Sequence, residues 1–366
     1  MADFTADDCR FMARALSLAA NGRYTAHPNP RVGCVLVKDG VVVGEGWHRR
    51  AGEPHAEINA LEAAGAAAKG CTAYVSLEPC SHHGRTPPCV DALRTAGVGA
   101  VVAAMQDPNP DVSGQGFAAL KKAGVRIQVG LMETEAKALN RGFASRCVRG
   151  RPWVTVKSAA SLDGRTAMAG GESRWITGEA ARRDVQRLRA SSGAILTGVD
   201  TVLADDPALT VRDPDVETGG RQPLRVVLDS RLRTPAGARL LQEGGATHIY
   251  CVDDAARAPL EAVDATVIRV PSDGERTSLS AVLESLAALQ INDVLVEAGP
   301  RLAGSLLAAK LVDELVIYLA PHIMGSETRG LYETPGWRAL EARQPLRITD
   351  LRQIGEDIRI TAAPRN

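Results

Sequence analysis

The sequence has few aromatic residues, no prevailing charge and no long hydrophobic run. Phe, Trp and Tyr make up only 4% of the 366 residues, so the core must be built mainly from Ala, Val and Leu. The 43 basic side chains balance the 43 acidic ones, which gives no electrostatic reason to expect binding to nucleic acid or a membrane surface. No stretch of about 18 uninterrupted apolar residues occurs, which excludes a membrane-spanning helix.

Disulfides and a secretion signal are not indicated either. The seven cysteines are an odd number spread along a long chain, unlike the disulfide framework of a small secreted domain. Arg10 and Arg14 interrupt the first twenty residues, and Thr5 with Asp8 predicts a capping box at the start of an amphipathic helix. We therefore expect a cytoplasmic enzyme with reduced thiols, some of which could hold a metal.

The first half alternates between strand-like and helix-like segments. Asp39-Gly40 lies between two Val-rich runs and predicts a tight hairpin. The expected helices are 56–68, 90–96, 117–123 and 133–148, and the later strands are 72–77, 98–104 and 125–129. This order predicts an α/β domain in which the hairpin forms an antiparallel edge.

A second α/β alternation follows a break at 149–152. Length alone, at roughly 150 residues per domain, predicts about two domains. The break divides the chain into domains 1–149 and 150–366. The expected strands of the second domain are 153–157, 193–197, 224–228, 247–252, 293–297 and 314–319, with a basic helix over 182–189 and an exposed loop over 213–222.

Two segments of the first half carry a set of metal ligands. One imidazole, His55, and two thiolates, Cys80 and Cys89, favour zinc over magnesium or calcium. Three protein ligands leave the fourth tetrahedral position to water, as in catalytic sites, and zinc makes such a water acidic near neutral pH. Glu57 is a carboxylate that could carry protons beside this water. The pattern therefore predicts a catalytic zinc site.

Plainer interpretations of these residues stay open. His55 and Glu57 also suit a solvated helix start, and two cysteines nine residues apart could be ordinary buried thiols. His82 and His83 are competing ligands, although we favour a place for them in a loop that faces the substrate. The ordered combination, with a proline before His55 and another before Cys80, favours the metal site.

The His-x-Glu pair with its two cysteines resembles the zinc site of the cytidine deaminase superfamily. The superfamily signature has two residues between its cysteines, whereas here there are eight, SHHGRTPP. This insert and the upstream run TAHPNPRVG resemble the deaminase half of the bifunctional riboflavin-biosynthesis deaminase–reductases. The resemblance implies a cytidine-deaminase-like α/β/α domain with Asn29 in the pyrimidine pocket; a turn between two prolines is the alternative role for Asn29.

The second domain lacks the usual dinucleotide signature. No G-x-G-x-x-G follows a strand there, so Rossmann-type recognition is not supported. Glycine turns at 197–201 and 297–304 could bring backbone amides close to phosphate oxygens, although each also suits a plain strand-to-helix turn. The runs 157–165, 172–177 and 203–212 resemble the reductase half of the same family. The resemblance implies a dihydrofolate-reductase-like α/β domain that uses NADPH.

The same resemblance implies ligand contacts in this second domain. The implied NADPH contacts are Ala159, Trp175, Thr201, Asp205 and the 299–305 turn, made of Gly299, Pro300, Arg301, Leu302, Ala303, Gly304 and Ser305. The implied substrate contacts are Lys157, Ser173, Arg189, Leu209, Arg212 and Glu297. Arg and Lys suit a substrate phosphate, whereas Arg182, Arg183 and Arg187 could equally form a solvated helical face.

Two consecutive steps of riboflavin synthesis are implied. Zinc-activated water would deaminate 2,5-diamino-6-(5-phosphoribosylamino)pyrimidin-4(3H)-one, with Glu57 moving the protons. NADPH would then reduce the ribosyl chain of 5-amino-6-(5-phosphoribosylamino)uracil to ribityl. The family also suggests a homodimer, and we expect neither nucleic acid nor membrane as a partner. The alternatives are a nucleoside or nucleic-acid deaminase with a non-catalytic second domain, and a non-enzymatic protein with structural zinc.

Overall fold

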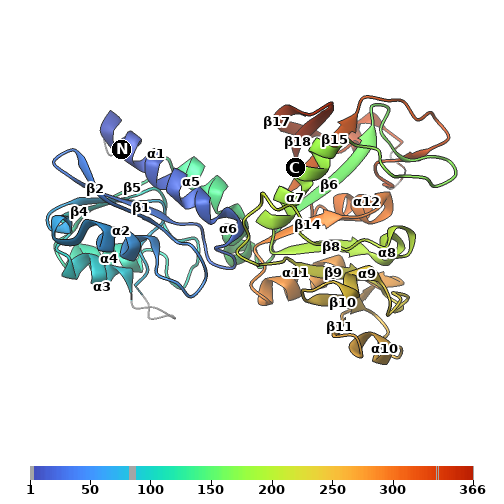
Figure 1. Ribbon diagram of the computed structural model, residues 1–366, viewed down its shortest axis with the longest axis horizontal. Helices are drawn as coiled ribbons and strands as arrows, with labels where there is room; N and C mark the ends of the chain where they lie inside the picture. Colours follow the sequence, from blue (N-terminus) through green and yellow to red (C-terminus); the bar gives the residue numbers. More distant parts are fainter. Residues whose placement is uncertain (1–3, 82–87, 335, 337, 366) are drawn as a thin grey trace. The chain divides into compact units, whose positions relative to one another are not determined.

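Figure 1 shows the computed structural model, which describes residues 4–81, 88–334, 336 and 338–365. The chain forms two compact units, Met1–Arg151 and Pro152–Asn366. Both units are mixed α/β structures, each with its own central sheet. No helix in the described part of the chain is long and apolar enough to cross a membrane.

The first unit is built on a five-stranded sheet with the order β2-β1-β3-β4-β5. Its strands are β1 (Gly33–Lys38), β2 (Val41–Trp47), β3 (Thr72–Val75), β4 (Ala100–Ala103) and β5 (Arg126–Val129). β1 is antiparallel to both neighbours, while β3, β4 and β5 are parallel. Asp39 and Gly40 have φ values of 50° and 77°. A tight hairpin needs this left-handed conformation, so the predicted hairpin is confirmed.

Helices cover both faces of this sheet. They are α1 (Ala6–Ala20), α2 (Ala56–Ala64), α3 (Cys89–Thr95), α4 (Gln115–Lys122), α5 (Glu133–Leu139) and α6 (Arg141–Arg149). α1 begins at the predicted Thr5–Asp8 capping box. Val35 of β1 packs with α1 and α5, whereas Leu36 packs with α2, α3 and α4. Successive strand residues point to opposite faces, so one strand supplies both halves of an α/β/α core.

The predicted helix over 133–148 is wrong in one respect, because it is interrupted at Asn140. There the backbone leaves the helical region, with φ −110° and ψ 24°. The buried Asn140 carboxamide accepts the Arg31 N–H at 2.8 Å and donates to the Arg31 carbonyl at 2.9 Å. This partner lies 109 residues away, so helical periodicity contains no sign of the break.

The second unit is built on a nine-stranded sheet with the order β11-β10-β9-β8-β14-β6-β15-β18-β17. The first seven strands of this order, from β11 to β15, are parallel to one another. β18 and β17 add an antiparallel hairpin that we did not predict. The strands are β6 (Trp153–Ser161), β8 (Ala194–Gly198), β9 (Leu224–Leu228), β10 (Thr247–Cys251), β11 (Ala265–Arg269), β14 (Asp293–Glu297), β15 (Glu314–Ala320), β17 (Leu346–Ile354) and β18 (Asp357–Pro364).

Helices pack on both faces of this sheet as well. They are α7 (Glu179–Ser191), α8 (Val199–Asp205), α9 (Arg239–Gln242), α10 (Ala258–Glu261), α11 (Leu279–Ala288) and α12 (Pro300–Ala308). Val226 of β9 joins the core under α11 and α12, whereas Val227 joins the core with α8, α9 and α10. Two short pairs complete the unit, β7 (Arg165–Ala167) with β16 (Arg329–Gly330), and β12 (Ser272–Asp273) with β13 (Arg276–Thr277).

The 213–222 segment is a loop, as predicted, but it is only partly exposed. Val216 and Thr218 are buried within it. The Gln222 carboxamide accepts the Val211 N–H at 2.8 Å and donates to the Val211 carbonyl at 3.0 Å. These contacts fix the loop to the segment that follows α8.

Candidate active sites

Three potential zinc ligands converge in the first unit. His55 caps the start of α2, Cys80 lies in the loop after β3, and Cys89 is the first residue of α3. His55 Nδ1 lies 3.5 Å from Cys80 Sγ and 3.3 Å from Cys89 Sγ. A tetrahedral zinc ion bonded at about 2.0 Å to nitrogen and 2.3 Å to sulfur would separate such atoms by about 3.5 Å. The donor set and its spacing therefore fit zinc.

The two thiols differ in their surroundings. The pKa of Cys80 is lowered by a hydrogen bond from the Cys89 thiol and by His55, although burial opposes both. The Cys89 backbone N–H, at the start of α3, also donates to Cys80 Sγ at 3.3 Å. The hydrogen bond with Cys80 and burial raise the pKa of Cys89. A thiolate at Cys80 is thus stabilised by the protein itself, as a metal ligand requires.

Glu57 lies beside these ligands and is buried, with 3% of its surface exposed. Burial raises the pKa of its carboxyl to about 7, and the charge of Cys80 adds to this effect while His55 opposes it. A carboxyl that titrates near neutral pH can both accept and donate a proton. Among the described residues, His55, Cys80 and Cys89 form the one group of three close potential ligands, and Glu57 is not a member.

His48 is a residue of this site that sequence reasoning missed. Its ring is 2% exposed and packs edge-on against His55, with ring centroids 5.2 Å apart. Asn29 Nδ2 lies 3.0 Å from His48 Nε2, and His48 Nδ1 lies 3.2 Å from the Pro54 carbonyl. The structure therefore links Asn29 to the metal ligands through His48. A lone histidine at the end of a strand gives no local sign of this role.

Glu78 is a second residue that the sequence did not single out. Its buried carboxylate accepts backbone N–H groups of Asp107, Gly114 and Gly116 at 3.1, 2.9 and 2.9 Å. These bonds tie the loop before α4 to the segment that carries Cys80. His82 and His83, which we considered as competing ligands, lie outside the described residues.

In the second unit, three predicted substrate contacts, Lys157, Arg189 and Glu297, form one charged cluster at the carboxyl end of β14. The Glu297 carboxylate accepts hydrogen bonds from Arg189 Nε at 2.6 Å and Arg189 Nη2 at 3.0 Å. Its Oε2 atom lies 3.5 Å from Lys157 Nζ. Arg189 also donates to the Thr210 carbonyl at 3.0 Å, next to the buried Leu209. Within the described part of the chain, the Arg212 side chain makes no direct contact with this cluster; its backbone N–H donates to Gln186 Oε1 at 2.9 Å. Burial lowers the pKa of Arg212, the charge of Arg189 adds to the effect, and that of Glu297 opposes it.

This cluster holds more positive than negative charge. Burial by itself would raise the pKa of Glu297, but Arg189 and Lys157 outweigh it and lower that pKa to about 2. Glu297 is therefore ionised at neutral pH and offsets one of the two cations beside it, Arg189 and Lys157. One positive charge is left in excess, and the Lys157 side chain is 19% exposed. Such a site suits an anionic ligand.

The predicted turn over 299–305 is wrong as secondary structure, because helix α12 already begins at Pro300. Gly299 and Arg301 are exposed, whereas Pro300, Ala303 and Gly304 are buried. A Cβ atom on Gly304 would lie 1.9 Å from the Glu333 carbonyl oxygen. Gly304 therefore permits close packing inside a helix, which the motif alone could not distinguish from a glycine turn. Leu302 and Ser305 are partly buried on the same helix.

Other predicted NADPH contacts gather around α8. Thr201 lies in its first turn, and Asp205 is its last residue. Arg174 donates to the Asp205 carbonyl, which fixes the loop that carries Ser173 and the 72% exposed Trp175 beside α8. Arg182 lies over the Trp175 ring at 4.8 Å, so it is not simply a solvated charge. Ala159 lies apart from these on β6, opposite Tyr318 of β15.

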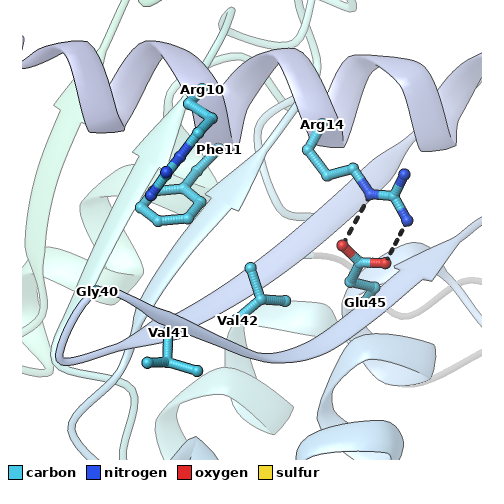
Figure 2. Close-up of a pocket in the computed structure, with 7 residues that line it drawn as sticks. All are labelled: Arg10, Phe11, Arg14, Gly40, Val41, Val42 and Glu45. Carbon is cyan, nitrogen blue, oxygen red and sulfur yellow. Dashed lines mark hydrogen bonds and ion pairs between the residues drawn. The ribbon is translucent and has the colours of Figure 1, made fainter.

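A shallow depression between α1 and the β1–β2 hairpin contains none of the predicted site residues (Figure 2). Arg14 and Glu45 form a two-pronged ion pair across it, with both N–O distances 2.8 Å. Val41 and Val42 are exposed at its lower side. Nothing in this lining resembles the metal or anion sites described above.

Comparisons with known proteins match both units of the chain. Residues 5–105 match the cytidine and deoxycytidylate deaminase zinc-binding region, and residues 152–360 match the RibD C-terminal domain. The riboflavin biosynthesis protein RibD of Escherichia coli (strain K12) is 53% identical over 95% of this chain and 97% of its own length. These full-length matches do not favour a deaminase with an unrelated second domain or a non-enzymatic zinc protein.

Solved structures agree over the whole chain. The structure of Acinetobacter baumannii RibD has a TM-score of 0.93 and 43% identity, covering 98% of this chain and 99% of that one. A diaminohydroxyphosphoribosylaminopyrimidine deaminase/5-amino-6-(5-phosphoribosylamino)uracil reductase from Thermotoga maritima has a TM-score of 0.87 and 32% identity, with the same coverage. The chain therefore belongs to the RibD family, the bifunctional deaminase/reductases of riboflavin biosynthesis.

Proposed function

We propose that residues 1–149 deaminate a diaminopyrimidinone ribosyl phosphate and that residues 150–366 reduce the ribosyl chain of the deaminated product with NADPH. The Thermotoga maritima relative is named a diaminohydroxyphosphoribosylaminopyrimidine deaminase/5-amino-6-(5-phosphoribosylamino)uracil reductase, which supports this assignment. The separate compact units, one with the His/Cys/Cys cluster and one with the charged cluster at β14, support this division. The substrates are 2,5-diamino-6-(5-phosphoribosylamino)pyrimidin-4(3H)-one and 5-amino-6-(5-phosphoribosylamino)uracil.

In the first unit, His55, Cys80 and Cys89 would hold zinc, which when bound would supply a water acidic enough to react near neutral pH. Glu57 would accept a proton from the attacking water. Glu57 then delivers the proton to the amino nitrogen, which leaves as ammonia. The burial of Glu57 and its pKa of about 7 support both transfers. Asn29, held by His48, lines the pyrimidine pocket.

When bound in the second unit, NADPH would supply the hydride that reduces the opened ribosyl chain, and a proton from solvent would complete the hydroxyl group. Lys157 and Arg212 bind the substrate phosphate. Arg189 and Glu297 also contact the substrate and complete the charged cluster. The remaining substrate contacts are Ser173 and Leu209. Arg189 cannot turn freely toward a ligand because Glu297 and Thr210 hold its guanidinium. The starts of α8 and α12 bind NADPH together with Ala159, Trp175 and Asp205.

One observation carries the proposal for the first unit: a buried carboxyl, Glu57, lies beside three converging metal ligands without being one of them. The test is the Glu57→Gln protein, assayed for ammonia release and for bound zinc. We expect a rate loss of about 100- to 10,000-fold with zinc content unchanged. Glu62→Gln, exposed on the same helix, is the matched control. Normal ammonia release by Glu57→Gln would overturn the mechanism.

We also propose a cytoplasmic homodimer whose ligands are small molecules and not nucleic acid. The balanced charge supports the absence of a polynucleotide groove. β17 lies at the edge of the nine-stranded sheet and exposes Ile348 and Leu351 at 60% and 64%, which supports pairing with a second copy. Light scattering should give twice the chain mass, and Ile348→Lys should shift the protein toward monomer. A monomeric wild-type protein would contradict the dimer.

A further inference from the structure

We propose that Gln222 is a positioning residue for the reductase substrate, because its carboxamide holds the backbone segment 209–212 in place. This segment carries Leu209 and Arg212, two of the proposed substrate contacts. The inference rests on the proposed function of the second unit and adds a residue that acts through these contacts without touching the substrate. Groups held in their bound geometry lose less freedom on binding, so a residue that only holds a contact can raise the affinity for a ligand.

The segment after α8 has no regular backbone hydrogen bonding of its own. Residues 206–213 belong to no helix or strand, and none of 207–212 takes part in a backbone–backbone hydrogen bond within the described part of the chain. Asp206 and Leu209 have φ values of 40° and 51°, a left-handed conformation that is unfavourable for residues other than glycine. Such a backbone persists only where surrounding groups hold it. Side chains must therefore hold this segment.

The Gln222 side chain makes two hydrogen bonds at the centre of the segment. Its Oε1 accepts the Val211 N–H at 2.8 Å, and its Nε2 donates to the Val211 carbonyl at 3.0 Å. The carboxamide thus makes the pair of bonds that a residue of a neighbouring antiparallel strand would make. Val211 is buried, so without Gln222 its backbone N–H and carbonyl would lose their partners away from bulk water. Val211 directly precedes Arg212 and follows Leu209 by two residues, so its position affects both contacts.

Gln222 can hold the segment because its own backbone is fixed on both sides. Arg221 donates to the Ser192 carbonyl at 3.0 Å and to the Ala190 carbonyl, both at the end of α7. Two residues after Gln222, Leu224 begins strand β9, which pairs with β8 in the central sheet. The carboxamide therefore projects from backbone that is held to a helix and to the sheet.

The rest of the segment contacts the charged cluster, Glu243 and helix α7. The Thr210 carbonyl accepts Arg189 Nη1 at 3.0 Å, and the Thr210 hydroxyl donates to Glu243 at 3.2 Å. The Arg212 N–H donates to Gln186 Oε1 of α7 at 2.9 Å. A shift at the centre of the segment would therefore move both an acceptor that orients Arg189 and the backbone that carries Arg212. We expect substrate affinity to depend on this position, whereas the proposed NADPH contacts lie outside the segment.

The experiment measures NADPH oxidation by the full-length protein on 5-amino-6-(5-phosphoribosylamino)uracil, with kcat and KM determined separately. Gln222→Met keeps the length of the side chain and removes both hydrogen bonds. We expect KM for this substrate to rise about 5- to 30-fold, while kcat and the dissociation constant of NADPH change by less than about threefold. Gln222→Asn keeps the carboxamide on a side chain one carbon shorter, and its KM should lie between those of the wild-type protein and Gln222→Met. A role in stability alone would lower the midpoint of thermal unfolding without this change in KM.

Gln242→Met is the matched control, because it removes a similar carboxamide bond, from Gln242 Nε2 to the Ala236 carbonyl at 3.1 Å, outside the 209–212 segment. Its KM should stay within about twofold of the wild-type value. An unchanged KM in Gln222→Met, an equal rise in Gln242→Met, or the failure of both Gln222 variants to fold would overturn the inference. If the wild-type protein did not oxidise NADPH on this substrate, the proposed reductase function itself would fail, and this result is distinct from an altered KM in a working enzyme.

Discussion

Arg189 and Glu297 form a two-pronged ion pair between helix α7 and strand β14, with N–O distances of 2.6 and 3.0 Å. Their side chains are only 12% and 10% exposed. Two parallel hydrogen bonds fix the guanidinium plane, and Glu297 also holds Lys157. This arrangement makes Glu297 as much a part of the proposed anion site as the two cations beside it, because it sets where they point.

The first prediction concerns pH and stability. The pKa of Glu297 is about 2 in the folded protein, against 4.5 for an ordinary glutamate. Its stabilising contribution, about 3 kcal/mol from this difference, is complete above pH 4.5 and is lost as the pH falls toward 2. Glu297→Gln should lower the free energy of unfolding by about 3–5 kcal/mol at pH 7, since it leaves two cations with no carboxylate.

Urea unfolding at pH 7 and at several values below 4.5 measures both effects. The variant should show a flatter pH dependence in the acid range than the wild-type protein. Glu284→Gln, exposed on α11, is the control and should keep the wild-type pH profile. A Glu297→Gln protein with unchanged acid sensitivity would show that this carboxylate is not the group that titrates.

The second prediction concerns the reduction step. Lys157→Met should lower kcat/KM for NADPH oxidation on the deaminated substrate by about 10- to 100-fold, because a charged contact to the substrate is lost. Ammonia release should continue at the wild-type rate, since Lys157 belongs to the second unit. Lys310→Met, exposed after α12, serves as the control. Unimpaired reduction by Lys157→Met would refute the assigned contact.

The third prediction concerns zinc. Cys80→Ser should reduce zinc affinity by more than the roughly 10- to 100-fold typical of residues that only support metal ligands. Ammonia release should fall with the zinc content, while NADPH oxidation on deaminated substrate persists. Elemental analysis and the two separate assays check this. Cys9→Ser, an exposed thiol outside the cluster, should keep its zinc; full zinc occupancy in Cys80→Ser would contradict the site.

The fourth prediction concerns packing at α12. A methyl group at Gly304 would collide with the Glu333 carbonyl oxygen, so Gly304→Ala should destabilise the second unit by about 1–3 kcal/mol. In an open helix the same change would stabilise the protein by about 1 kcal/mol. The midpoint of thermal unfolding distinguishes the two signs. Gly237→Ala, where no atom lies within 4 Å of the added carbon, is the control.

Much of the local structure follows from short-range patterns. The Thr5–Asp8 capping box and the Asp39-Gly40 hairpin were predictable because their hydrogen bonds and backbone angles involve residues close together in the chain. The break at Asn140 was not, because its partner is the backbone of Arg31. The start of α12 was also missed, because the sequence does not distinguish a glycine that permits a turn from one, such as Gly304, that permits close packing inside a helix.

The sequence by itself determined the chemistry that is available: an imidazole and two thiols in a spacing that resembles a zinc deaminase, and a set of basic residues suited to a phosphate. Only the tertiary structure decided how these groups act. It buries Glu57 so that its pKa rises to about 7, places His48 between Asn29 and His55, and commits Arg189 to Glu297. Burial and pairing depend on residues far apart in the chain, so no local pattern contains them.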